Sequence, residues 1–216
     1  SGVADTCTVT VDRARSVIAN FSANGFDPLN DSADFVKQQY QDLLGRKPDS
    51  ATLNDLVASL KSGAVTRAKL IESLMDSDEF RGRLDPVVRL YTAYFKRLPD
   101  YEGLTYWVNR MHPGSGMGLG LVQVSDAFAQ SNEFVLTYGQ LSHTAFISRV
   151  YQNVLGRDPE AEGYAYWMGR LSAGMPRGEV MLGFSESAEN KQANAQSQLV
   201  TTTYAGLMRR APSAAE

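Results

Sequence analysis

The stretch Tyr40–Asp49 reads YQDLLGRKPD, and its pattern returns as YTAYFKRLPD from Tyr91, YQNVLGRDPE from Tyr151 and YAGLMRRAPS from Tyr204. The four copies align without a gap. Each starts with Tyr and has a large apolar residue four places on, Arg six places on and Pro eight places on. Such self-similarity is the signature of a repeat protein, in which neighbouring copies stack and bury a common core.

The similarity between copies continues downstream. A Gly stands twelve places and a Trp sixteen places after the Tyr in two copies, as Gly103, Trp107, Gly163 and Trp167. Three copies then close on Ser-x-Glu, at Ser77, Ser131 and Ser187. We therefore predict an N-terminal segment with one helix at 1–33, three full repeats at 34–82, 85–136 and 144–192, and a partial repeat at 197–216.

The apolar spacing within each copy is helical. Phe35, Val36, Tyr40, Leu43 and Leu44 form one stripe, so the Tyr and the apolar residue four places on are predicted to be core. This first helix must stop before the Pro, and Gly45 and Gly156 suit a left-handed C-cap there.

A second helix is predicted after each Pro, with an Asp as its N-cap, at Asp49, Asp100 and Asp158. It ends near Gly63, Pro113 and Gly174, and a third helix follows. The only strand pattern is Cys7–Val11, and residues 12–24 predict one further helix. The predicted fold is all-α, an array of three-helix repeats packed into one compact helical domain.

Composition limits the function classes. The 216 residues are 43% hydrophobic and 21% charged, with a net charge of −3. Nucleic-acid-binding proteins usually carry an excess of basic residues, and this chain has none. No run approaches the ~18 apolar residues of a membrane span. Cys7 is the single cysteine, which leaves a free thiol, an interchain disulfide or lipid attachment as alternatives.

The pattern Tyr-x3-Leu-Gly-Arg-x-Pro-Asp, then Gly and Tyr-Trp, then Ser-x-Glu-Phe, resembles a bacterial family catalogued as domain of unknown function 4214. The third copy resembles it best. The resemblance implies an all-helical domain, distantly like phycobilisome linker domains, in a secreted or cell-surface bacterial protein. The family has no established catalytic residue, so the resemblance assigns none to this chain.

The repeated Arg residues are Arg46, Arg97 and Arg157. One interpretation is structural: each binds carbonyls at the helix end or the Glu of its own copy, at Glu79, Glu133 and Glu189. The other is a row of Arg and aromatic side chains that binds a glycan or an acidic partner. Tyr106, Trp107, Tyr166 and Trp167 are likewise either core residues or sugar-stacking platforms, and exposure distinguishes the two.

No catalytic, metal or cofactor residue is predicted. His112 and His143 have no partner at ligand spacing, and no Gly-x-Ser-x-Gly, His-Glu-x-x-His or phosphate loop occurs. The segment Met111–Gly120 lengthens the second repeat with four glycines and a proline. We predict a mobile insertion there, and it is a candidate for repeat-specific function.

These observations favour a non-enzymatic extracytoplasmic module for protein or glycan interaction, in adhesion or surface assembly. The alternative is a hydrolase, or an accessory domain of one, acting on cell-wall or polysaccharide substrate. Two carboxylates ~5–10 Å apart in one cleft would favour the alternative.

Overall fold

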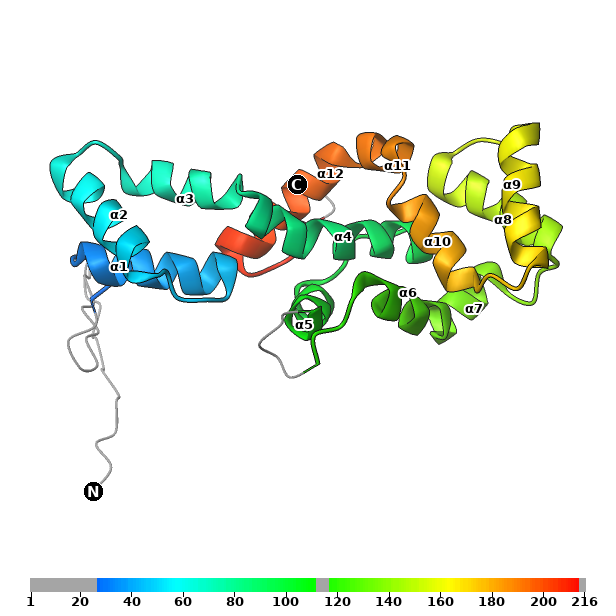
Figure 1. The fold of residues 1–216 in the computed structure, drawn as a ribbon, viewed down its shortest axis with the longest axis horizontal. Helices are drawn as coiled ribbons and strands as arrows, with labels where there is room; N and C mark the ends of the chain where they lie inside the picture. Colours follow the sequence, from blue (N-terminus) through cyan, green and yellow to red (C-terminus); the bar gives the residue numbers. More distant parts are fainter. Residues whose placement is uncertain (1–26, 112–116, 214–216) are drawn as a thin grey trace, which may run out of the picture.

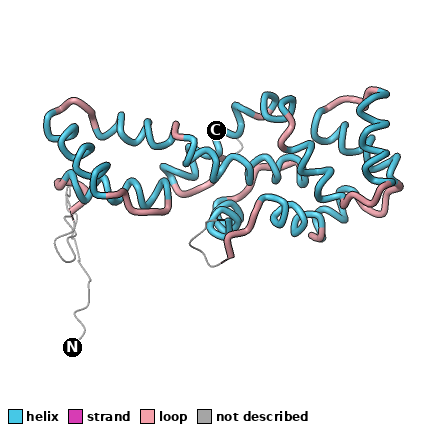
Figure 2. The backbone as a smooth tube through the Cα atoms, viewed as in Figure 1, coloured by secondary structure: helices cyan, strands magenta, loops and turns pink. Residues whose placement is uncertain are grey.

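The computed structural model describes residues 27–111 and 117–213. Throughout these residues the chain forms helices and turns and no strand, so the all-α prediction is confirmed (Figure 2). Cys7, the strand pattern Cys7–Val11, the helix predicted over 12–24 and His112 lie outside the described residues.

From α1 to α9 the helices are distributed along the long axis of the molecule, with α4 in its centre, and α10 to α12 turn back toward α4 (Figure 1). In the first half they are α1 (Ser32–Gln39), η1 (Tyr40–Leu44), α2 (Ser50–Ser62), α3 (Arg67–Met75), α4 (Asp78–Phe95) and α5 (Tyr101–Met111). In the second half they are α6 (Leu121–Ala129), α7 (Asn132–Tyr138), α8 (His143–Val150), η3 (Tyr151–Leu155), α9 (Ala161–Ser172), α10 (Arg177–Ser185), α11 (Ala188–Ala193), α12 (Ala195–Thr203) and η4 (Tyr204–Met208).

The repeated Tyr begins the last turn of a helix. In three copies this turn is π-helical, as η1, η3 and η4, and it directly continues α1, α8 and α12. Gly45 and Gly156 then take left-handed conformations with φ of 70° and 68°, as predicted. Lys96 and Arg209 adopt the same conformation with φ of 55° and 51°. A left-handed residue therefore ends this helix in all four copies, although only Gly adopts that conformation without steric cost.

Burial confirms only part of the predicted core. Tyr40, Tyr91 and Tyr151 are buried, and so is Leu44. The other residues four places after the Tyr lie further out: Phe95 and Leu155 are half-buried, and Met208 is 58% exposed. The described part of the fourth copy has no second and third helix to cover Met208.

The predicted N-caps are right in two copies of three. Asp49 accepts a hydrogen bond from Thr52 N at 2.9 Å, and Asp100 accepts one from Gly103 N at 2.6 Å. The prediction for Asp158 is wrong, because α9 begins two residues later and Glu160 occupies its N-cap position. The Asp158 carboxylate instead accepts from Gln152 Nε2 at 2.5 Å.

The Ser-x-Glu motif begins a helix rather than closing a repeat. The Oγ atoms of Ser77, Ser131 and Ser187 accept from the backbone N three residues on, at 3.1–3.2 Å, and cap α4, α7 and α11. A further helix therefore follows the three predicted for each copy. The 18-residue helix α4 runs without a break through residues 82–85, where the first two predicted repeats meet.

Helices from different copies share one core. Tyr94 of α4 places its Oη 2.6 Å from Ser125 Oγ of α6, and Ser125 Oγ donates to Gly178 O of α10 at 2.9 Å. A Cβ on Gly178 would lie 2.6 Å from Asp126 Oδ1 and 3.4 Å from Asp126 Cα, so α6 and α10 are in close contact at this Gly.

The C-terminal part of the chain returns to the first copy. A Cβ on Gly206 of η4 would lie 3.0 Å from Phe80 and 3.2 Å from Leu43, and Arg209 forms an ion pair with Asp42. In Figure 1 the C-terminal segment accordingly lies beside the start of α4. The fourth copy thus packs on the first.

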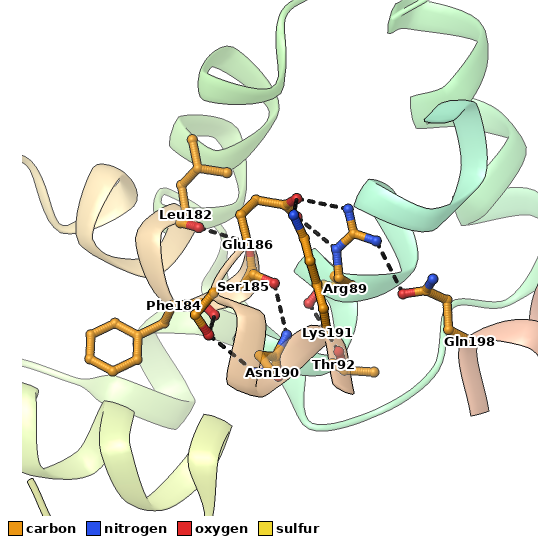
Figure 3. A network of polar contacts seen from close by, with 10 residues as sticks. Arg89, Thr92, Leu182, Phe184, Ser185, Glu186, Asn190, Lys191 and Gln198 are labelled. Atoms are coloured by element: carbon orange, nitrogen blue, oxygen red, sulfur yellow. Dashed lines mark hydrogen bonds and ion pairs between the residues drawn. The ribbon is translucent and has the colours of Figure 1, made fainter. Parts of the chain in front are cut away.

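A polar network connects α4 to the C-terminal helices (Figure 3). The Arg89 guanidinium donates to both carboxylate oxygens of Glu186, at 2.8 and 2.7 Å, and to Gln198 Oε1 at 3.2 Å. Lys191 adds a second cation 3.1 Å from Glu186. Because the Arg89 side chain is only 9% exposed, this pair is largely buried, and removing one partner would leave a buried charge without compensation.

Candidate functional site

Each repeated Arg is bound to the Glu of its own copy. Two parallel hydrogen bonds join Arg46 to Glu79 at 2.5 and 2.8 Å, Arg97 to Glu133 at 2.8 and 3.0 Å, and Arg157 to Glu189 at 2.7 and 2.8 Å. In all three the remaining Nη1 donates to the carbonyl of the next residue. The prediction that these Arg residues bind the repeat Glu is confirmed, whereas the carbonyls that they bind lie beyond the helix end, at Lys47, Leu98 and Asp158.

The same guanidinium groups cover the repeat Tyr rings. The distances from Cζ to the ring centroids are 5.3 Å for Arg46 over Tyr40, 5.2 Å for Arg97 over Tyr91, 5.1 Å for Arg157 over Tyr151 and 4.8 Å for Arg210 over Tyr204. Each Arg therefore links the end of one helix to the start of another, through a Tyr face and, in three copies, a carboxylate.

These ion pairs lie near the surface. All six side chains are roughly 40% exposed, so each pair contributes at most about 1 kcal/mol of stability. The hydrogen bonds from Arg97 and Arg157 lower the pKa of Glu133 and of Glu189. In each of these three pairs, Nε and Nη2 of the Arg already donate to the two carboxylate oxygens of the Glu.

The two Tyr-Trp pairs divide between core and surface. Trp107 and Trp167 are half-buried and pack on Phe128 and Phe184, with ring centroids 5.2 and 5.0 Å apart. Their neighbours Tyr106 and Tyr166 are 47% and 52% exposed. Of the predicted aromatic candidates, the Tyr residues therefore present the accessible rings, and the Trp residues support them from below.

An Arg lies over each exposed Tyr. Arg110 is 3.4 Å from the ring centroid of Tyr106, and Arg170 is 5.3 Å from that of Tyr166. Both stand four residues after their Tyr, on the same face of the helix. Sequence reasoning did not select Arg110 and Arg170, although the matching stretches YWVNR and YWMGR contain the signal.

A shallow groove of about 410 Å³ opens beside Tyr166. It is lined by residues at the start of α6, in α9 and along α10: Leu121, Val122, Tyr166, Trp167, Met175, Glu179, Leu182, Gly183 and Glu186. A Cβ on Gly183 would lie 2.5 Å from the Trp167 ring, so the Gly lets the indole rest on α10. The groove thus has an aromatic wall and an apolar floor.

Two carboxylates complete the groove. Glu179 is exposed, and Glu186 is the residue that binds Arg89. Burial alone would raise the pKa of Glu186. Hydrogen bonds from Arg89 and Lys191 have the larger effect, so the pKa of Glu186 is lowered. Glu186 therefore stays ionised and serves as a hydrogen-bond acceptor.

In residues 27–111 and 117–213, no three His, Cys, Asp or Glu side chains gather closely enough to hold a metal ion. His143 is exposed at the start of α8. No helix among these residues is long and apolar enough to cross a membrane.

The predicted insertion Met111–Gly120 is described only at its ends. Leu119 N donates to Arg110 O at 2.9 Å, which brings the two ends together, and Met117 is 59% exposed. Residues 112–116 lie outside the described chain, so the predicted mobility of this segment stays a prediction.

Comparison with known proteins identifies the family. No curated protein and no solved structure matches the chain. The family model described as domain of unknown function (DUF4214) matches residues 19–84 and 125–194, which together exceed half of the chain. The chain therefore belongs to the DUF4214 family.

Proposed function

We propose that the chain is a non-enzymatic, extracytoplasmic module that binds a glycan or a protein surface, in adhesion or surface assembly, through the groove beside Tyr166. The observation that carries this proposal is the combination of an exposed Tyr ring, a supporting Trp and two carboxylates in one open groove. Aromatic faces pack on the apolar faces of sugar rings, and carboxylates accept hydrogen bonds from hydroxyl groups.

Protein recognition uses the same residue types. Tyr, Trp and Arg are the side chains most enriched among the residues that dominate binding energy at protein interfaces, and Tyr166, Trp167 and Arg170 are adjacent on α9. The two carboxylates favour a ligand rich in hydroxyl groups or in Lys and Arg. Of these we favour the glycan, because Arg170 over the Tyr166 ring would repel a cationic ligand.

The second copy provides an internal control. Counting back from the helix-capping Ser residues, Glu179 and Glu186 correspond to Gln123 and Gln130, so the second copy has amides where the third has carboxylates. Tyr106 is exposed much as Tyr166 is, but it lines none of the described grooves. Binding that depends on the groove should therefore respond to the third copy alone.

The test is glycan-array screening of the purified chain, followed by calorimetry on any oligosaccharide that it retains. We expect Tyr166→Ala to weaken binding at least tenfold, about 1.4 kcal/mol, and Glu179→Gln to weaken it severalfold. Tyr106→Ala should leave binding unchanged. Equal losses in Tyr106→Ala and Tyr166→Ala would overturn the assignment to this groove.

The hydrolase alternative meets a specific obstacle in the same groove. Glu186, the C-cap residue of α10, already accepts hydrogen bonds from Arg89 at both carboxylate oxygens, whereas a glycosidase needs two carboxyl groups that act on one glycosidic bond. Glu186, with its lowered pKa, is also a poor proton donor. Release of reducing ends from polysaccharide by the purified chain, lost in Glu179→Gln, would favour the alternative.

A further inference from the structure

A second cavity, of about 570 Å³, opens where η1, α4, α5 and η4 meet. It lies away from α9 and the groove described above (Figure 1). Its size falls within the range of small-molecule sites, about 300–1,000 Å³. Apolar side chains of α4 and α5 form part of its wall. The polar and charged residues that also line it are Gln41, Asp42, Arg83, Thr105 and Asn109.

Arg83 is the cation of this cavity, and its hydrogen bonding is incomplete. Nη1 donates to Leu43 O at 3.0 Å, and the buried Nε has no hydrogen-bond partner among the described residues. No carboxylate of the described chain forms an ion pair with it. Most buried polar groups in folded proteins are paired, so a half-buried guanidinium in this state needs an explanation.

The repeat does not require an Arg at this position. Arg83 stands six places after the capping Ser77, where the other copies have Thr137 and Ala193. The structural Arg that binds Glu79 is Arg46. Arg83 is therefore a feature of the first copy alone.

Gly45 makes room for this guanidinium. A Cβ on Gly45 would lie 2.7 Å from Arg83 Nη2, whereas a Cβ on the equivalent Gly156 would meet no atom within 4 Å. The closest acidic residues are already engaged, since both Glu79 oxygens accept from Arg46 and the Asp42 carboxylate binds Arg209 and Gln38. Arg83 thus forms no ion pair with a carboxylate of the described chain, and burial lowers its pKa although the charge of Glu79 acts in the opposite direction.

We propose that this cavity binds a small carboxylate-bearing molecule, whose carboxylate pairs with Arg83 and whose polar groups contact Gln41, Thr105 and Asn109. The planar guanidinium matches a carboxylate better than it matches any neutral group. Tyr101 and Leu104, which also line the cavity, offer surface for the body of the ligand. A uronic acid or an aromatic acid has this chemistry.

Two pairs of probes test the proposal by NMR titration of the full ¹⁵N-labelled chain. Glucuronate is compared with glucose, and benzoate with benzyl alcohol, so that each pair differs at the carboxylate. We expect at least one of the two acids to shift the signals of Gly45, Gln41 and Asn109 saturably, and its neutral partner to leave them unchanged. No saturable shift with either acid, or an equal response to inorganic phosphate, would overturn the proposal.

Variants locate the response within the cavity. Arg83→Gln should weaken binding of the responding acid at least tenfold, whereas Arg81→Gln removes a charge from the same helix outside this cavity and should leave binding unchanged. If Arg83→Gln loses the fold, Asn109→Ala changes an exposed residue and should weaken binding severalfold with an unaltered melt. Unchanged affinity in Asn109→Ala and in any folded Arg83→Gln would refute the site. Tyr166→Ala should leave this binding intact, which separates it from the proposed function.

Discussion

Gly163 permits the repeat Tyr to pack against the second helix of its copy, and replacing it tests that packing. Gly163 lies in the first turn of α9, and a Cβ there would collide with Tyr151 Oη and with Glu160 Oε1. Glu160 is exposed and can rotate away. Tyr151 is buried, and its ring meets Phe184 edge-on at 4.9 Å between centroids, so it has no room to withdraw.

The magnitude follows from two opposing terms. Ala is the better helix former by about 0.8–1.0 kcal/mol, whereas overpacking of a filled core costs about 1–3 kcal/mol. We expect Gly163→Ala to lower the free energy of unfolding by up to about 2 kcal/mol, which corresponds to at most roughly 8 °C in Tm for a chain of this size. Gly169→Ala in the same helix meets no atom within 4 Å and should instead raise stability by about 0.5–1 kcal/mol.

Urea and thermal unfolding of four proteins measure this interaction: the parent chain, Gly163→Ala, Tyr151→Phe and the double variant. Removing the Tyr hydroxyl should recover most of the loss caused by the added methyl group, so the two changes should couple by about 1 kcal/mol or more. A Gly163→Ala protein that gains as much stability as Gly169→Ala would refute the reasoning, because Oη would then not occupy the space above residue 163.

Three further predictions concern the ion pairs. Arg157→Lys keeps the charge but loses the planar fork, and we expect the urea midpoint to fall by the equivalent of at most about 1 kcal/mol; an unchanged midpoint with impaired partner binding would show a functional Arg instead. Arg157 lowers the pKa of Glu189, so this pair stabilises the fold above the unfolded Glu pKa of about 4.3 and loses that contribution as pH falls. Glu189→Gln should therefore make Tm fall less steeply in acid than it does in the parent chain. An equally steep fall in both proteins would contradict this prediction. Glu186→Ala leaves Arg89 buried without its carboxylate and should cost about 3 kcal/mol, whereas a melt within a degree of the parent would contradict the buried pair.

Much of the fold was predictable because its signals are local and repeated. Pro48 stops the first helix, Gly45 caps it, and Asp49 starts the next one, all within five residues. The Ser-x-Glu motif was misread because its position late in each copy suggested an ending. A Ser whose Oγ accepts from the third following N–H is a helix start, and that reading was available from the sequence.

The pairing of Arg157 with Glu189 was predictable for the same reason: both members recur at nearly constant separation, 33, 36 and 32 residues in the three copies. Arg89 and Glu186 give no such signal. They lie 97 residues apart, and their pairing depends on how α10 and α12 fold back on α4. The exposure of Tyr166 beside a half-buried Trp167 also depended on tertiary packing, because helical spacing allowed either residue to face the core.

In this repeat fold, the residues that recur between copies are engaged in contacts within the fold. The repeated Tyr is covered by its Arg, and in three copies that Arg is bound to a Glu, which leaves little of either for a partner. The candidate sites arise where one copy departs from the others. Glu179 and Glu186 replace amides of the second copy, and Arg83 replaces an uncharged residue of the second and third. The four copies share the left-handed helix end after the repeated Tyr, and three share the capping Ser. Such a substitution therefore adds a charged group without changing these helix boundaries. Differences between copies, rather than the shared motif, therefore distinguish the two proposed binding sites.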